Sequence, residues 1–132
     1  MRNPCEAGKV IKRILSNSDS INERVRGGIY PIVAPTEKIP CIVYKKASAS
    51  PASTKDGRSY DEFTFEVSAV CKTYTDMVDL SGLIMDALDG FSGEVEGLRV
   101  KRISLTDTAD LFDSDAYVQS MTYKVKIMDN SN

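Results

Sequence analysis

Four aspartates near the C-terminal end of the sequence could act as ligands for a hard cation. They are Asp107, Asp110, Asp113 and Asp115. Ca²⁺ prefers carboxylate and carbonyl oxygens, so such a cluster is a natural candidate for a calcium site. The segment nevertheless lacks the alternating Asp/Asn ligands, the central glycine and the closing glutamate of an EF-hand loop. We therefore expect a solvated acidic turn without a metal ion, and we expect no cofactor.

The composition excludes most common forms of catalysis. The 132 residues contain no histidine, which removes the Ser/His/Asp triad, the Cys/His nucleophile pair and the imidazole general base. Two carboxylates alone can hydrolyse a glycosidic bond when they face each other across a cleft. Nothing in the sequence selects such a pair. We expect a protein that is not an enzyme.

The three cysteines fit neither a disulfide framework nor a Cys-x-x-Cys metal or redox site. Cys5, Cys41 and Cys71 are odd in number and widely spaced, which is typical of a reducing compartment. Cys71 falls on the inward-facing side of a predicted strand and Cys41 in an apolar run, so both are expected in the core. Charged residues interrupt the first fifteen positions, and no run approaches the ~18 apolar residues of a membrane span. A cytoplasmic protein without a membrane partner is expected.

Two amphipathic helices are predicted. The first has Asn3 as its N-cap, followed by proline, and its apolar residues recur at helical spacing as far as Leu15. The second begins near Thr75 or Asp76, carries a similar apolar stripe and stops at Gly90.

Five strands are predicted from short apolar runs and from alternation of apolar and polar residues. They cover residues 29–33, 41–44, 61–74, 98–105 and 117–127. Pro31 makes the first an edge strand, because proline cannot donate to a ladder. The small polar segment 45–60 is predicted to be a long exposed loop, and 106–115 an acidic turn. The order α-β-β-β-α-β-β predicts a single α+β domain over residues 1–132, with a mostly antiparallel sheet and two helices packed on one face.

Charge is distributed unevenly along the chain. Residues 1–58 carry eleven basic and five acidic side chains (+6), whereas residues 59–132 carry six and fourteen (−8), which together give the net charge of −2. Oppositely charged regions suit head-to-tail contact between copies of one chain, and such contacts form a ring when the rotation closes. The basic residues of segment 45–58 also allow an alternative, a small nucleic-acid-binding module.

Several short motifs, in their order and spacing, resemble the tail-completion or tail-terminator (head-tail joining) proteins of long-tailed phages and prophages. The motifs are Arg26-Gly27-Gly28-Ile29-Tyr30-Pro31, Ala34-Pro35, Pro40-Cys41-Ile42-Val43-Tyr44, Lys55-Asp56-Gly57, Phe63-Thr64-Phe65-Glu66-Val67 and Ala87-Leu88-Asp89-Gly90. The resemblance covers nearly the whole chain, from the first helix to Ile127.

The resemblance implies a structural virion protein. It implies small subunits that form a ring, expected to be a hexamer, at the head-proximal end of the tail tube, where they stop tube polymerisation and meet the head connector. DNA would only pass through the lumen. Assembly would take place in the cytoplasm of the bacterial host, and segment 45–60 would be an arm that orders against a neighbour. The expected interface residues are Lys45, Lys46, Lys55, Arg58, Asp107, Asp110 and Asp113.

Overall fold

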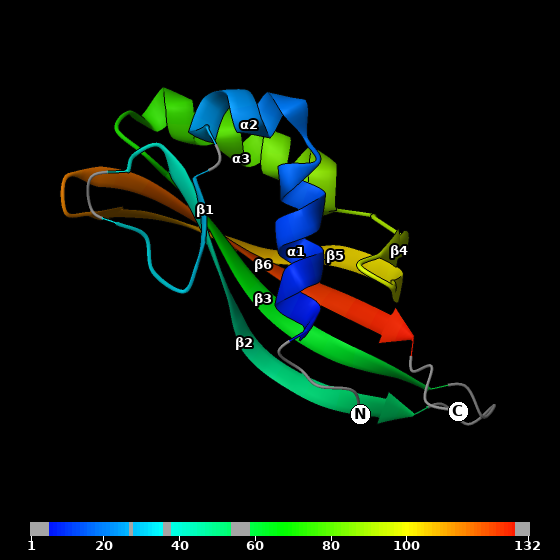
Figure 1. The fold of residues 1–132 in the computed structure, drawn as a ribbon. Coiled ribbons are helices and arrows are strands. Elements are labelled where there is room, and N and C mark those ends of the chain that lie inside the picture. The colour runs from blue at the N-terminus through cyan, green and yellow to red at the C-terminus, as the bar shows by residue number, and fades with distance from the viewer. Residues whose placement is uncertain (1–5, 27, 36–37, 54–58, 129–132) are drawn as a thin grey trace.

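A curved six-stranded sheet carries three helices on one face (Figure 1). The computed structural model describes residues 6–26, 28–35, 38–53 and 59–128, with the backbone alone for 50–53 and 59. The element order is α1-α2-β1-β2-β3-α3-β4-β5-β6. The α+β class is therefore confirmed, with one helix and one strand more than the sequence predicted. Among the described residues, no helix is both long enough and apolar enough to cross a membrane.

Helix α1 spans Ala7–Ser16 and buries the predicted apolar stripe. Val10, Ile11 and Leu15 lie on the buried face of this helix and belong to the hydrophobic core. Glu6 is the N-cap of the described helix and provides no side-chain bond. Asn3 and the proline after it lie outside the described residues.

Helix α2 spans Asp19–Val25 and was not predicted. The side chain of Ser18 caps it by accepting a hydrogen bond from the Ile21 backbone N–H at 3.3 Å. The polar segment after α1 thus ends one helix and starts the next. Seven residues make too few turns for a clear apolar periodicity, and only Ile21 and Val25 are buried.

Helix α3 spans Tyr74–Leu88, so the second predicted helix is confirmed with a start one or two residues earlier. Thr73 caps it by accepting from the Asp76 N–H at 3.1 Å. Gly90 follows the helix with a φ of +82°, a conformation that glycine adopts without strain.

The sheet order is β1-β2-β3-β6-β5-β4. The sheet is mixed, because β1 runs parallel to β2 whereas the other neighbouring strands are antiparallel. The parallel pair corrects the expectation at one edge, and the short β4 was not predicted. The strands are β1 Ile29–Pro31, β2 Cys41–Ser53, β3 Ser59–Cys71, β4 Gly93–Val95, β5 Leu98–Asp113 and β6 Ala116–Met128.

Two predicted irregular segments are strands instead. Most of the expected loop 45–60 belongs to β2 and β3, which pair from Cys41 to Ser53, and residues 54–58 lie outside the described residues. The expected acidic turn 106–115 continues β5 and pairs with β6 as far as Asp113. The connecting turn is only Ser114 and Asp115, with φ of +51° and +64°, as in two-residue hairpins. In both segments, pairing with a neighbouring strand satisfies the backbone N–H and C=O groups, although the polar composition is typical of a loop.

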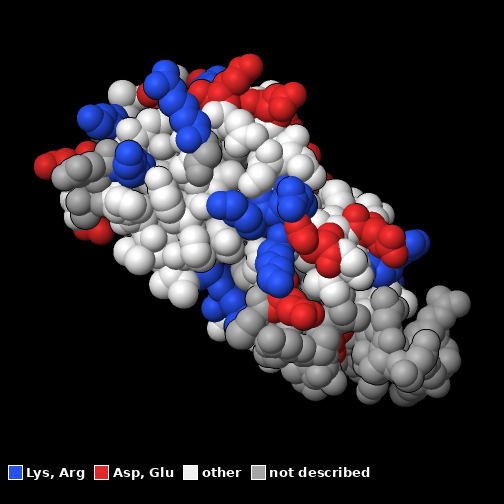
Figure 2. Space-filling view, in the orientation of Figure 1, with Lys and Arg blue, Asp and Glu red and all other residues white. Residues whose placement is uncertain are grey.

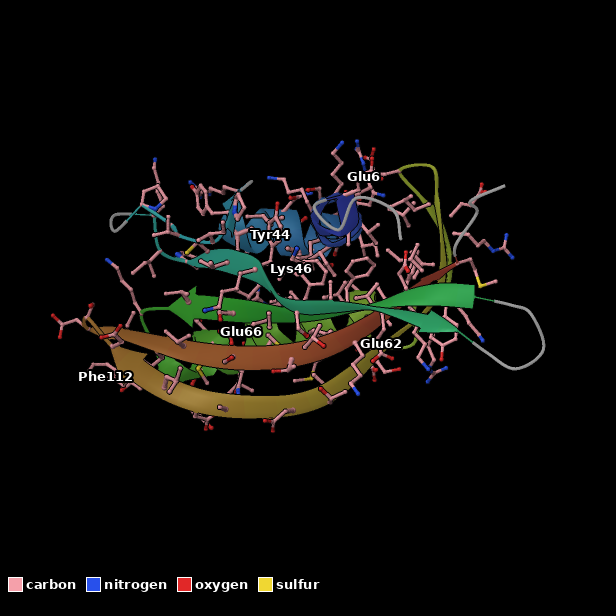
Figure 3. The ribbon with its side chains drawn as sticks, turned by 90° about the horizontal axis from the view of Figure 1, so that it is seen from below. Glu6, Tyr44, Lys46, Glu62, Glu66 and Phe112 are labelled. Atoms are coloured by element: carbon pink, nitrogen blue, oxygen red, sulfur yellow. The ribbon has the colours of Figure 1, made fainter. Side chains whose placement is uncertain are left out.

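The core lies between the helices and the face of the sheet that they cover. Alternate residues of β3 and β6 point into it, among them Phe63, Phe65 and Tyr123. Their sequence neighbours, such as Glu62 and Glu66, lie on the other face and are partly exposed (Figure 3). The predicted alternation of these two strands is confirmed. Cys41 and Cys71 are buried as expected.

Candidate subunit interface

The predicted basic residues that the structure describes lie on β2. Lys45 and Lys46 are exposed neighbours and therefore point to opposite faces of the strand. The Lys45 ammonium lies 3.9 Å from the Glu66 carboxylate of β3. Lys55 and Arg58, the other two predicted basic residues, lie outside the described residues. The described part of the basic set is therefore a strand segment and not a loop.

The predicted acidic residues lie on β5. Asp107, Asp110 and Asp113 are all exposed. Six residues of extended chain span about 20 Å, so these carboxylates are strung along the strand. Accordingly, no group of three or more potential ligands that could hold a metal ion is found in the described part of the chain.

The described basic residues, Lys45 and Lys46, do not meet the acidic set within one subunit. Strands β3 and β6 separate β2 from β5, which places the two sets toward opposite edges of the sheet (Figure 3). A contact between them requires a second copy of the chain.

The fold interleaves the oppositely charged halves of the sequence. Two ion pairs link the halves through helices, Arg13 to Glu96 at 2.6 Å and Arg24 to Asp79 at 3.9 Å. Figure 2 shows basic and acidic side chains side by side on the helix face. The two halves of the sequence therefore do not form separate basic and acidic regions of the surface. Charge complementarity between copies of the chain can arise only at individual edges of the sheet.

One edge of the sheet is formed by β1 at one end and by β2 at the other. Strand β1 pairs with β2 only up to Tyr44, and its own outer edge is closed to further strands. The Lys12 ammonium donates to the Ile29 carbonyl at 2.9 Å, the Pro31 carbonyl accepts from Val33 at 2.7 Å, and proline has no N–H. From Lys45 onward, no strand of the described chain covers the outer side of β2.

The opposite edge is formed by β4 at one end and by β5 at the other. Strand β4 pairs with β5 only over Leu98–Val100. Farther along, Ile103 exchanges backbone bonds with Gly90 and Phe91, and the Leu105 N–H donates to the Asp89 carboxylate at 3.0 Å. Beyond Leu105, no strand among the described residues covers the outer side of β5.

Exposed apolar side chains accompany both uncovered edges. Ile32 and Val33 follow β1 and are 73% and 74% exposed, and Leu111 and Phe112 on β5 are 53% and 62% exposed. Ile32 has a φ of +69° and is bridged by the bond from Val33 to Pro31, which forms a strained γ-turn. A β-branched residue rarely adopts this conformation, and such strain often occurs at functional surfaces. These residues were not predicted as part of an interface, although the apolar pair Leu111-Phe112 between aspartates was a detectable signal in the sequence.

An aromatic cluster fixes the end of the β5–β6 hairpin. The Tyr117 ring makes edge-to-face contacts with Phe112, at 5.0 Å between centroids, and with Tyr74, at 6.1 Å. Tyr74 is the first residue of α3, so the cluster joins the hairpin end to the helix. Such contacts hold Phe112 in place although much of its ring is exposed.

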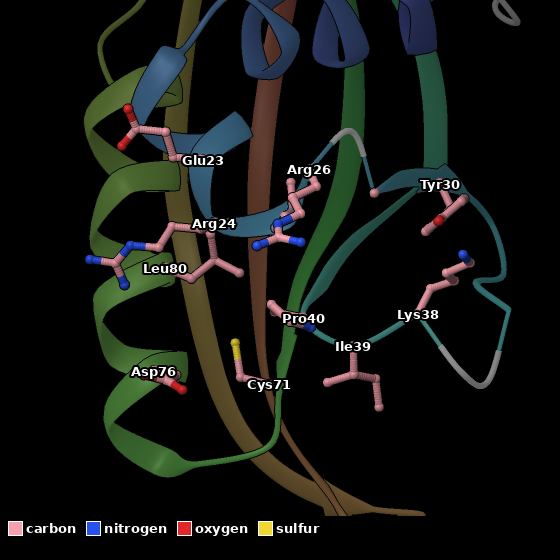
Figure 4. Close-up of a pocket in the computed structure, with 12 residues that line it drawn as sticks. Glu23, Arg24, Arg26, Tyr30, Lys38, Ile39, Pro40, Cys71, Asp76 and Leu80 are labelled. Carbon is pink, nitrogen blue, oxygen red and sulfur yellow. The ribbon is translucent and has the colours of Figure 1, made fainter.

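A pocket of about 560 Å³ lies between α2, α3 and the segment before β2 (Figure 4). Its lining combines the basic side chains of Arg24, Arg26 and Lys38 with the acidic groups of Glu23 and Asp76. Opposite charges in an open site largely compensate each other, so the pocket offers no consistent field for a charged ligand.

The thiol of Cys71, which lines this pocket, is expected to be unreactive. Burial, with a smaller contribution from Asp76, raises the pKa of Cys71 from 9.0 to about 11, and burial also raises the pKa of Cys41. The thiolate fraction of Cys71 at pH 8 is then about 100-fold below that of an ordinary cysteine. Peptide mass spectrometry after iodoacetamide treatment should show alkylation of Cys71 at least 100-fold slower in the native protein than in urea. Equal rates would contradict the buried environment.

Uncovered sheet edges with exposed apolar side chains are features of surfaces that bind other proteins, and the described chain has two such edges of opposite charge. The particular family follows from sequence comparison: residues 9–128 match the family model of the tail completion protein gp17. The chain therefore belongs to this family, and its role is structural, in a phage-type tail.

Solved structures share the fold. A chain in the virion of a native gene transfer agent particle matches with a TM-score of 0.68 and 12% identity, over 96% of this chain and 100% of that chain. A second solved chain matches with a TM-score of 0.55 and 12% identity, over 96% of this chain and 95% of that chain. No curated protein sequence matches.

Proposed function

We propose that the chain forms a ring at the head-proximal end of a phage tail tube. There it stops tube polymerisation and provides the surface to which the head connector docks. The main support is the family match over residues 9–128. The fold likeness to a chain in a gene transfer agent virion agrees with this assignment.

The two uncovered edges supply what a ring requires. In a head-to-tail ring each subunit uses one surface toward one neighbour and a different surface toward the other. The outer sides of β2 and β5 are two such surfaces at opposite edges of one sheet. The partners in this proposal are other copies of the chain, expected to number six, the tail-tube protein and the head connector. DNA only passes through the lumen and makes no specific contact.

The alternative of a nucleic-acid-binding module has lost part of its basis. It relied on a basic loop, but Lys45 and Lys46 point to opposite faces of a strand, and Lys45 lies beside Glu66. Nucleic-acid grooves combine a basic track with aromatic stacking platforms. Lys101 and Lys126 both lie over the Tyr60 ring, at 5.1 Å from its centroid, so cations of the chain itself already contact this ring.

Deletion of the gene from a phage or prophage that carries it tests the proposal. We expect filled heads that are separate from their tails and tubes of uncontrolled length, because nothing ends polymerisation. Electron microscopy measures both effects, and complementation with the intact gene serves as the control. Antibody-bound gold should label only the head-proximal end of wild-type tails. Normal joined particles in the deletion strain, or label along the whole tube, would overturn the proposal.

A further inference from the structure

We propose that neighbouring subunits join by strand pairing between their uncovered edges. In this interface Thr106–Asp113 of β5 in one subunit runs antiparallel to Lys45–Ser53 of β2 in the next. The sheets of adjacent copies then form one continuous sheet. This inference rests on the proposed ring and specifies how the ring is closed.

Backbone chemistry selects these two segments. The edge of a strand carries unpaired N–H and C=O groups, which form a template for another strand. The outer edge of β1 is closed by Pro31 and by the bond from Lys12 to Ile29. Bonds to Asp89, Gly90 and Phe91 occupy the edge of β5 before Thr106. Within Thr106–Asp113, the Asp107 carboxylate accepts from the Thr108 N–H at 2.9 Å. What remains for pairing within the described chain is the rest of that segment and the Lys45–Ser53 segment of β2.

Strand direction agrees with antiparallel pairing. Strands β2, β3, β6 and β5 are successive antiparallel neighbours, so β2 and β5 of one subunit run in opposite directions. When two copies stand side by side in the same orientation, as in a ring, β5 of one copy therefore meets β2 of the next antiparallel.

The charges on the two edges favour a heterologous contact, in which β2 of one subunit meets β5 of another. Two β5 edges would bring Asp110 and Asp113 together with their own copies, and two β2 edges would do the same with Lys45 and Lys46. Like charges placed opposite each other on paired strands are destabilising, whereas opposite charges contribute favourably. Pairing of β2 with β5 is thus favoured over both symmetric alternatives.

One stagger brings the charges and the apolar residues together. Within a subunit, Lys45 shares a row across the sheet with Asp107. The centre of Thr106–Asp113 in one subunit lies opposite the centre of Lys45–Ser53 in the next only if the two subunits are displaced along the strand direction. The displacement is about six residues, or roughly 20 Å. That shift places the Lys45 region beside Asp110–Asp113 of the neighbour and brings Ile32 toward its Leu111 and Phe112. Four strands span about 19 Å across the sheet, so the shift corresponds to a strand tilt of about 45°, as in closed barrels.

Charge reversal at one edge at a time tests the interface. One variant carries Lys45→Glu and Lys46→Glu, and the other carries Asp110→Lys and Asp113→Lys. Sedimentation velocity at low salt should show that each variant alone associates at least tenfold more weakly than the wild type. An equimolar mixture should regain association, because a reversed β2 edge of one variant then meets a reversed β5 edge of the other. Asp79→Lys with Asp86→Lys, both exposed on α3, is the matched control and should associate as the wild type does.

Each outcome decides the inference. Weak single variants with recovery in the mixture support it. Association that is insensitive to both reversals, recovery that is absent from the mixture, or a wild type that stays monomeric at millimolar concentration overturns it. Circular dichroism confirms that each variant is folded. The gold-labelling experiment is independent, so a failure of edge pairing leaves the tail-end position standing, and loss of that position leaves the association data valid.

Discussion

Replacement of Phe63 by alanine is expected to lower the free energy of unfolding by about 3–5 kcal/mol. Phe63 is fully buried on β3, between strands β2 and β6, in the face covered by the helices. Truncation removes the packing contacts of the phenyl ring. It leaves a cavity that the curved sheet can close only in part. A domain of this size has about 5–15 kcal/mol of stability in total, so this one change removes a large share of it.

Urea unfolding followed by circular dichroism measures the effect. The matched control is Ser68→Ala on the same strand, because Ser68 lies on the uncovered face and is only partly buried. It is expected to change stability by about 0.5 kcal/mol or less. Equal losses in the two variants would contradict the assignment of the two faces of β3.

Gly28→Ala is expected to cost about 1–3 kcal/mol, although it adds a single methyl group. A Cβ at this position would lie 2.9 Å from the Val25 carbonyl oxygen, which is backbone and cannot move aside as a flexible side chain can. The Gly28 N–H donates to that same oxygen, and the Gly28 carbonyl accepts from Ile42. The added methyl group would thus disturb the junction between α2, β1 and β2.

Gly82 provides the opposite result in the same kind of experiment. It lies within α3, and a Cβ there would meet no atom within 4 Å. Gly82→Ala is therefore expected to raise stability by about 0.5–1 kcal/mol, because alanine loses less backbone entropy in a helix. A destabilised Gly82→Ala, or a Gly28→Ala with wild-type stability, would show that the packing around these glycines differs from the structure.

These variants also separate folding from assembly. Phe63→Ala and Gly28→Ala reduce the amount of folded subunit, so any loss of rings should follow their urea midpoints. The charge-reversal variants at Lys45 and Lys46 or at Asp110 and Asp113 leave the core intact. They should weaken association without a comparable loss of stability. Comparison of unfolding and sedimentation for the same variants distinguishes the two effects.

Local periodicity made the long helices and the alternating strands predictable. The stripe from Val10 to Leu15 and the alternation around Phe63 depend only on residues a few positions apart, because an amphipathic element must bury its apolar side. The absence of histidine likewise limited the chemistry without any structural information. The family resemblance rested on the order of short motifs and was confirmed.

The interface could not be located in the same way. Sequence identified Lys45 and Asp110 as surface charges but assigned them to a loop and a turn, since both segments are polar. Their strand conformation depends on pairing with β3 and β6, whose partner residues are distant along the chain. Whether a polar strand has a partner on each side is a property of the sheet, and local composition does not encode it.

The sequence by itself determined which residues must be buried, that imidazole chemistry is absent, and which family the motifs resemble. The tertiary structure decided that the acidic and basic segments are strands, that they lie at opposite edges of one sheet, and that Ile32 and Phe112 stand exposed beside them. The physical reason is the range of the interactions. Burial periodicity acts within one element, whereas an uncovered edge exists only after every other strand has found its neighbour.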